Sequence, residues 1–209
     1  MRGDIMFTVT VMDSDQWIAQ GINCYFSEKH IRVRLVEQEE FDVALRIAAG
    51  SNVVISELCA FGRDVQAVTE LLVSLRRVSP NTRLIILTDM REKAVISHVL
   101  SRLPGVCVLS KRSDILQLAG EVFGYAVGPQ VQEEALTVRN NKEALTAREF
   151  GLLRLLATQR SLTDIGHRLQ LSVKTISQHR KNIMLKLGCR TSVELSPRLK
   201  RMGFGRRTA

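Results

Sequence analysis

Two hydrophobic periods alternate along the first 127 residues of the chain. Short apolar or alternating runs, typical of strands, occur at residues 7–12, 31–36, 53–56, 84–87 and 106–109. Each run is followed by a stretch with helical spacing, at residues 16–26, 39–49, 65–78, 92–100 and 113–127. Strands that alternate with helices in this way predict a parallel sheet covered on both faces, the (βα)5 arrangement of the α/β class. Functional residues of such a fold are expected at the carboxyl ends of the strands.

The pattern changes at Gly128-Pro129, a pair that ends regular structure. Residues 129–143 are polar and have no sustained period, which predicts a linker. Beyond the linker the spacing is helical only. We therefore expect an α/β domain over residues 1–128, a linker over 129–143 and an all-α domain over 144–209.

Capping residues divide the all-α part into short helices. Thr146 is followed by Glu149 at the spacing of a capping box, and Ser161 is placed to cap a second helix. A tight turn then leads to Ser172, the expected cap of a third helix that ends at Gly188. Two short helices joined by such a turn, the second of them cationic, are typical of a helix-turn-helix that reads the major groove.

The third helix, residues 173–187, has one apolar and one polar face. Val173, Ile176, Ile183 and Leu187 form the apolar stripe. On the polar face, Gln can bond adenine at two points and Lys suits the acceptors of guanine. The residues predicted to contact DNA are Ser177, Gln178 and Lys181 at base edges, and Lys174, Thr175, His179, Arg180 and Lys186 at phosphates. The alternative for this face is the solvated surface of an ordinary helix.

Charge favours the DNA interpretation. Residues 1–130 hold 14 basic and 15 acidic side chains, whereas residues 131–209 hold 16 basic and 6 acidic ones, a net charge of +10. A near-neutral first part joined to a strongly basic second part predicts that the second part binds a polyanion.

Composition excludes several other classes of protein. The chain has 209 residues, of which 45% are hydrophobic and 24% charged, the balance of a globular protein. No apolar run approaches the roughly 20 residues that span a bilayer, and the first residues lack the pattern of an export signal, so a cytoplasmic location is expected. The four cysteines are scattered without zinc-ligand spacing. No Gly-rich phosphate loop or nucleophile triad is visible, so we expect no metal, no cofactor, no catalytic residue and no enzymatic activity.

The all-α part resembles the tetrahelical DNA-binding domain of the LuxR/FixJ/NarL family over about 50 residues. The shared features are Arg148-Glu149, the pattern Leu-Ser-x-x-Thr-Ile-x-x-His over residues 171–179, and Lys-Leu-Gly at 186–188. This resemblance implies base reading by Ser177, Gln178 and Lys181. It also implies a last helix near residues 191–202, often used for pairing on DNA, which Pro197 is expected to kink or shorten.

With that domain attached, residues 6–127 resemble the receiver domain of a response regulator. The resemblance places Asp13 at the first acidic position, Glu57 at the phosphoacceptor position, Thr88 at the switch hydroxyl and Lys111 at the conjugate lysine. Ser14 replaces the second acid that would help to hold Mg²⁺, and Glu is not the usual acceptor. We therefore expect a degenerate site. Either Glu57 reaches Thr88 and Lys111 and imitates a phosphorylated receiver, or it is half of a leftover ion pair in a dimerisation module.

The expected function is a sequence-specific, phosphorylation-independent transcription regulator, similar to auxiliary regulators of the Rcs type. Expected partners are double-stranded DNA and a second copy or a conventional response regulator, with RNA polymerase as a further candidate and no membrane. Two alternatives stay open. One is an interaction protein that sequesters a partner regulator without reading DNA, and the other is a conventional phosphorylated response regulator.

Overall fold

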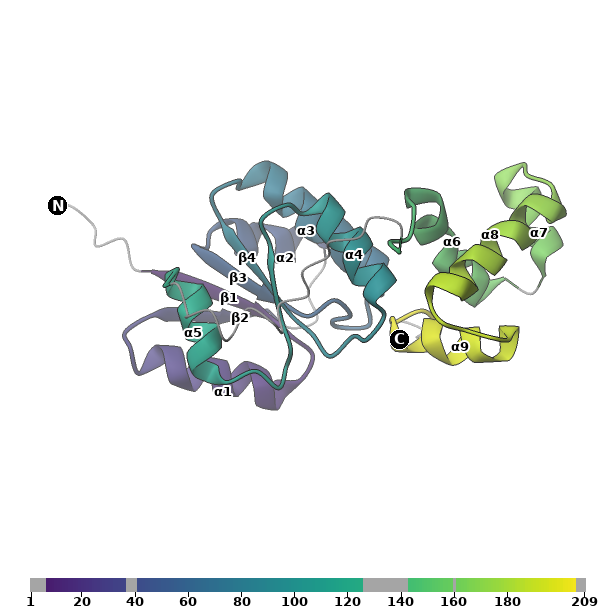
Figure 1. The fold of residues 1–209 in the computed structure, drawn as a ribbon. Coiled ribbons are helices and arrows are strands. Elements are labelled where there is room, and N and C mark those ends of the chain that lie inside the picture. Colours follow the sequence, from purple (N-terminus) through teal and green to yellow (C-terminus); the bar gives the residue numbers. More distant parts are fainter. Residues whose placement is uncertain (1–6, 37–40, 126–142, 160, 206–209) are drawn as a thin grey trace. The chain divides into compact units, whose positions relative to one another are not determined.

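The computed structural model in Figure 1 describes residues 7–36, 41–125, 143–159 and 161–205. Contacts divide the chain into two compact units, which are described separately. One unit comprises Met1–Phe61, Thr69–Asp89 and Leu103–Thr137, and the other comprises Gly62–Val68, Met90–Arg102 and Val138–Ala209. Nearly all of the expected linker lies outside the described residues.

Strands and helices alternate along the first part of the chain, as predicted. The strands are β1 (Thr8–Met12), β2 (Arg32–Leu35), β3 (Val53–Ser56), β4 (Arg83–Leu87) and β5 (Cys107–Leu109). The helices between and after them are α1 (Gln16–Ser27), α2 (Phe41–Ala49), α3 (Val65–Val78), α4 (Lys93–Arg102) and α5 (Ile115–Phe123).

The strands form one parallel sheet in the order β2-β1-β3-β4-β5. In the central pair, Met12 at the end of β1 lies opposite Ser56 at the end of β3. The residues that follow, Asp13 and Glu57, therefore leave the sheet side by side at its carboxyl edge. Every residue of β3 is buried, which is expected of a parallel sheet whose two faces are both covered.

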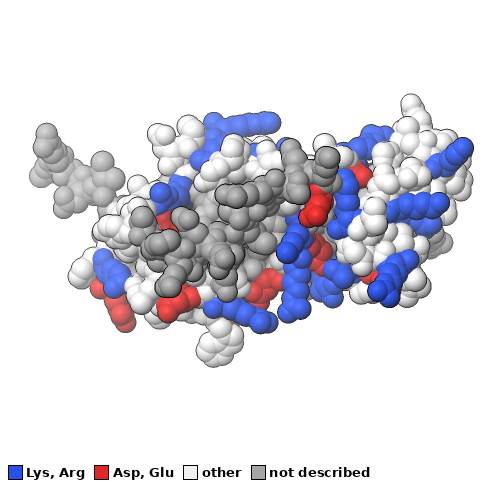
Figure 2. Space-filling model, viewed as in Figure 1, with Lys and Arg blue, Asp and Glu red and all other residues white. Residues whose placement is uncertain are grey.

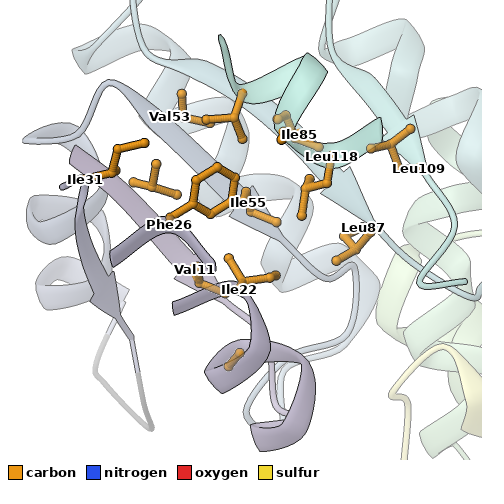
Figure 3. Packing of buried hydrophobic residues seen from close by; sticks show 14 residues of the cluster. Val11, Ile22, Phe26, Ile31, Val53, Ile55, Ile85, Leu87, Leu109 and Leu118 are labelled. Atoms are coloured by element: carbon orange, nitrogen blue, oxygen red, sulfur yellow. The ribbon is translucent and has the colours of Figure 1, made fainter. Parts of the chain in front are cut away.

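Helices α1 and α5 bury one face of this sheet. Phe26 of α1, with no exposed surface, packs among strand residues such as Val11 and Ile55, and Leu118 of α5 joins the same cluster (Figure 3). Complete burial of one such side chain contributes about 2–3 kcal/mol. The apolar residues of these helices recur at helical spacing, so their sequence pattern fixes the face that meets the sheet.

The C-terminal region is helical. It comprises α6 (Ala147–Thr158), α7 (Leu162–Leu169), α8 (Val173–Lys186) and α9 (Ser192–Arg201). The predicted caps are all present: Thr146 and Glu149 form a reciprocal capping box, and the hydroxyls of Ser161 and Ser172 accept hydrogen bonds from the backbone of α7 and α8. The α/β fold followed by a tetrahelical domain is therefore confirmed.

Some predicted boundaries were wrong. The last helix of the α/β part ends at Phe123 rather than residue 127, because Gly124 adopts a left-handed conformation with φ 73° and closes it. The second helix begins at Phe41 within the described residues, whereas residues 39 and 40 of the prediction lie outside them.

Pro197 was expected to kink or shorten the last helix. The shortening was wrong, because α9 runs through Pro197 from Ser192 to Arg201, and the kink stays a prediction. Proline removes one backbone donor, and in a regular helix the carbonyl that loses its partner is that of Val193, four residues earlier. Val193 is 81% exposed, so water can replace the missing bond. In the apolar stripe of α8, Ile176, Ile183 and Leu187 are buried, but Val173 is 44% exposed, because it occupies the first position after the turn.

Candidate functional site

The receiver-like residues converge at the carboxyl edge of the sheet. Asp13 directly follows β1, Glu57 follows β3, Thr88 follows β4, and Lys111 lies two residues beyond β5. Because these strand ends are neighbours in the sheet, four residues far apart in the sequence come together.

Lys111 and Glu57 are the centre of this group. The Lys111 ammonium lies 2.8 Å from Asp13 Oδ1 and 2.5 Å from Glu57 Oε2. Thr88 Oγ1 donates to Glu57 Oε1 at 2.5 Å, and the Leu58 backbone N–H donates to the same oxygen at 2.9 Å. Both oxygens of Glu57 are thus occupied by groups of the protein.

The pKa of Lys111 reflects this balance. Burial alone lowers the pKa of a lysine, but hydrogen bonds to Asp13 and Glu57 and the charges of both acids outweigh it, so the pKa stands above its ordinary value. Lys111 is therefore fully protonated at neutral pH. Its positive charge neutralises part of the acidic charge of the site.

The donor set does not fit Mg²⁺, which a working receiver requires. Ser14, in place of the second acid, accepts a hydrogen bond from the Phe61 backbone N–H at 2.6 Å. Asp15 caps α1 instead, where its carboxylate accepts from the first backbone N–H groups of the helix. Asp13 contributes a single buried carboxylate oxygen, Oδ2, without a hydrogen-bond partner in the described part of the chain. Magnesium prefers several oxygen ligands, and with Ser14 and Asp15 engaged elsewhere, Asp13 is the one acid of the first-strand segment that faces the site.

The turn between α7 and α8 has the geometry of a helix-turn-helix. Gln170 ends α7 in the left-handed conformation, with φ 54°. A Cβ on Gly166 would lie 2.8 Å from the Leu171 carbonyl oxygen, so a side chain there would displace the turn. Ser172 then starts α8, and its hydroxyl accepts from the Thr175 backbone N–H at 3.0 Å.

The polar face of α8 is open to solvent. Ile176 and Ile183 anchor the helix in the core, while Lys174, Thr175, Gln178 and Lys181 are exposed and Ser177 and His179 are half-buried. The space-filling view shows Lys and Arg side chains over α7, α8 and α9 (Figure 2). Lys174, Thr175, Gln178 and Lys181 thus share one exposed surface. Arg180, a predicted phosphate contact, is half-buried, and its Nε is enclosed and has no hydrogen-bond partner among the described residues.

Lys186 lies in a different environment from the one expected. Its ammonium donates to Glu149 Oε2 at 2.7 Å and to the Ala144 carbonyl at 2.8 Å, and only 20% of the side chain is exposed. Burial alone would raise the pKa of Glu149, but the hydrogen bonds and charge of Lys186, with the bonds to Thr146, lower it overall. The pair ties the end of α8 to the start of α6, so Lys186 fixes the helix instead of extending its polar face.

Sequence reasoning missed one neighbour of the base-reading face. Gln178 Nε2 donates to Asn182 Oδ1 at 3.0 Å, across one turn of α8. Asn182 is half-buried, whereas Gln178 is exposed. The spacing of four residues between two amides was the available signal.

Comparison with known families agrees with this geometry. Residues 143–197 match the model of the bacterial regulatory proteins of the luxR family. These residues form a LuxR-family domain. The match contains the capping box of α6, the turn and the whole of α8.

Named relatives are similar to the chain beyond the LuxR-family domain. The transcriptional activator protein BglJ of Escherichia coli (strain K12) is 29% identical over 154 residues, which cover 72% of this chain and 68% of BglJ. The fimbriae Z protein of Salmonella typhimurium is 31% identical over 138 residues, 60% of this chain and 64% of that protein. The transcriptional regulatory protein RcsB of Escherichia coli (strain K12) is 28% identical, covering 69% of this chain and 70% of RcsB.

Solved structures support the same fold. RcsB from Salmonella enterica serovar Typhimurium, bound to promoter rprA in the presence of phosphomimetic BeF3-, superposes with a TM-score of 0.62. The two chains are 23% identical, and the match covers 93% of this chain and 98% of that one. At this identity the similarity shows the fold alone, an α/β region followed along the chain by a C-terminal helical domain. Among the described residues, no helix is long and apolar enough to cross a bilayer.

Proposed function

We propose that the chain is a sequence-specific DNA-binding transcription regulator that inserts α8 of its LuxR-family domain into the major groove. The observation that carries this proposal is the polar face of α8. Lys174, Gln178 and Lys181 are exposed on a helix that Ile176 and Ile183 anchor in the core. A net charge of +10 over residues 131–209 supplies attraction to phosphate.

Two further observations favour a regulator. The relatives BglJ and RcsB are named as transcriptional proteins, and their similarity to this chain extends over more than the LuxR-family domain. We propose the domain limits expected from the sequence, with a receiver-like domain over 1–128, a linker over 129–143 and the DNA-binding domain over 144–209. The proposed role places the chain in the cytoplasm, where it acts on double-stranded DNA as a homodimer or beside a partner response regulator.

The receiver-like site supports independence from phosphorylation. Glu57 stands at the acceptor position, and its carboxylate already binds Thr88 and Lys111. A phosphoryl group carried on a conventional receiver would use the same two partners. We propose that the Glu57 carboxylate replaces it and holds the domain in one fixed state. A conventional phosphorylated regulator is disfavoured, because Glu57 stands in place of the usual acceptor and Ser14 in place of the second acid that would help to hold Mg²⁺.

The experiment that tests the function is selection of genomic fragments by the purified chain, followed by binding across a salt series. We expect discrete fragments to be enriched, with an affinity that falls linearly in log–log form as salt rises. The Gln178→Ala/Lys181→Ala variant should lose the enrichment, whereas Lys29→Ala, which removes a charge outside the LuxR-family domain, should retain it.

The interaction-protein alternative makes the opposite prediction. A chain that only sequesters a partner regulator would enrich no fragment and would be unaffected by loss of Gln178 and Lys181. Enrichment only in the presence of a second response regulator would instead identify a heterodimer.

A further inference from the structure

On the exposed face of α8, the Gln178 side chain forms a hydrogen bond with the side chain of Asn182. Gln178 Nε2 donates to Asn182 Oδ1 at 3.0 Å. The residues lie four positions apart, so their side chains are neighbours on the helix surface. Both belong to the LuxR-family domain.

The hydrogen bond leaves Gln178 with the groups that adenine requires. A glutamine amide has two N–H donors and one carbonyl acceptor. One donor is used by Asn182, so the second N–H and Oε1 remain available. Adenine presents an acceptor, N7, beside a donor, N6–H, in the major groove, and this pair matches the two remaining groups of Gln178.

Asn182 also restricts the conformation of Gln178. A free, exposed glutamine samples many rotamers, and DNA binding would have to select one of them. Asn182 is half-buried and is therefore the less mobile partner of the two. A side chain held in its bound conformation before contact loses less entropy on binding, which strengthens the preference for the matching base.

We propose that Asn182 is a positioning residue, which orients the Gln178 amide for bidentate recognition of adenine. This inference rests on the proposed function and adds to it one base class at one position of the site. Asn182 acts through Gln178 and has no base contact of its own.

The test is selection from random double-stranded DNA by the full chain and three variants. Gln178→Ala identifies the position that Gln178 reads. Asn182→Leu removes the acceptor with little change of size, and Asn182→Asp retains an acceptor oxygen. We expect the wild type to prefer adenine at that position on the order of tenfold, and Asn182→Leu to reduce the preference to about twofold or less. Asn182→Asp should keep the preference, although its added negative charge weakens binding to every sequence.

A second measurement separates positioning from loss of structure. Asn182→Leu should leave the salt dependence of binding and the preferences at all other positions unchanged, as a damaged helix would not. The inference is overturned if Asn182→Leu keeps the full adenine preference, or if Gln178→Ala changes no position of the selected motif. Failure of the wild type to select any motif would instead overturn the proposed function.

Discussion

Lys111 of the receiver-like site and Lys181 of the recognition helix have opposite surroundings. The Lys111 side chain is 14% exposed and lies within 2.8 Å of two carboxylates. Lys181 is exposed, and the described residues offer it no ion pair. One cation is neutralised by its own protein, and the other is available to an external anion.

The contrast extends to the neighbouring groups. In the receiver-like site, both oxygens of Glu57 accept from groups of the protein, Oε1 from Thr88 and Oε2 from Lys111. On α8, the Gln178 side-chain N–H donates one hydrogen bond to Asn182, and the Gln178 carbonyl oxygen remains available as an acceptor. The charges of Lys111 and Glu57 are thus paired within the protein, whereas the polar groups of Gln178 and Lys181 are exposed to solvent.

The largest expected effect concerns Lys186 and Glu149, which form a largely buried ion pair that ties the end of α8 to the start of α6. Glu149→Gln should destabilise the LuxR-family domain by about 3 kcal/mol, since it leaves the Lys186 ammonium without its anion. Urea denaturation at pH 7 measures the effect. Asp164→Asn, an exposed acid in the first turn of α7, is the matched control and should cost well under about 1 kcal/mol.

The difference in stability between the wild type and Glu149→Gln is predicted to depend on pH. The pKa of Glu149 is lowered from 4.5, so the folded state holds the carboxylate charged more readily than the unfolded state. The stabilisation is complete above that ordinary pKa and is lost as the pH falls through the depressed value. The gap in stability between wild type and Glu149→Gln should therefore shrink below about pH 4; a gap that stays constant to pH 3 would contradict the account.

Replacement of single lysines on the exposed face of α8 should distinguish residues that contact bases from residues that contact phosphates. Lys181→Ala should lose about 2 kcal/mol of specific binding and relax the preference at one base pair. Lys174→Ala should weaken binding to every sequence and reduce the salt slope by about one. Titrations of a selected site and of point-mutated sites distinguish these effects. Equal losses on all sequences for both variants would remove Lys181 from the base-reading set.

Removal of the Glu57 charge from the receiver-like site tests whether the ion pair between Glu57 and Lys111 stabilises the fold. Glu57→Gln should destabilise the α/β region by about 1–2 kcal/mol, because Lys111 retains only Asp13 as its anion. Glu28→Gln, an exposed acid at the end of α1, is the control and should have little effect. Thermal unfolding compares the two variants; equal melting temperatures would show that the Glu57 pair contributes nothing to the fold.

The smallest expected change in stability is that of replacing Pro197 in α9. Pro197→Ala should restore one helical hydrogen bond in α9 and stabilise the domain by about 1 kcal/mol, since proline costs a helix interior more than alanine does. Ser196→Ala, an exposed substitution beside it, is the control. A melting temperature that falls in Pro197→Ala would show that the proline conformation is required.

Periodicity predicted the alternating strands and helices, because burial in a parallel sheet leaves a strong apolar signal. The caps at Thr146, Ser161 and Ser172 followed from local chemistry. Tertiary contacts were harder to predict from the sequence. Lys186 was predicted to contact phosphate, yet it pairs with Glu149, 37 residues earlier. Pro197 does not shorten α9 as expected, because solvent near Val193 can replace the missing hydrogen bond. The distances around Glu57 depend on strand order, which the sequence pattern does not specify.

In the proposed function, α8 binds specific DNA while the receiver-like site needs no phosphoryl group. The most direct measurement is titration of a selected DNA fragment with the purified chain, with and without acetyl phosphate and Mg²⁺. We predict the same Kd under both conditions, together with loss of binding in Gln178→Ala/Lys181→Ala. An affinity that rises tenfold or more with acetyl phosphate would contradict the account, because it would require a working phosphorylation site where Glu57 and Lys111 now pair.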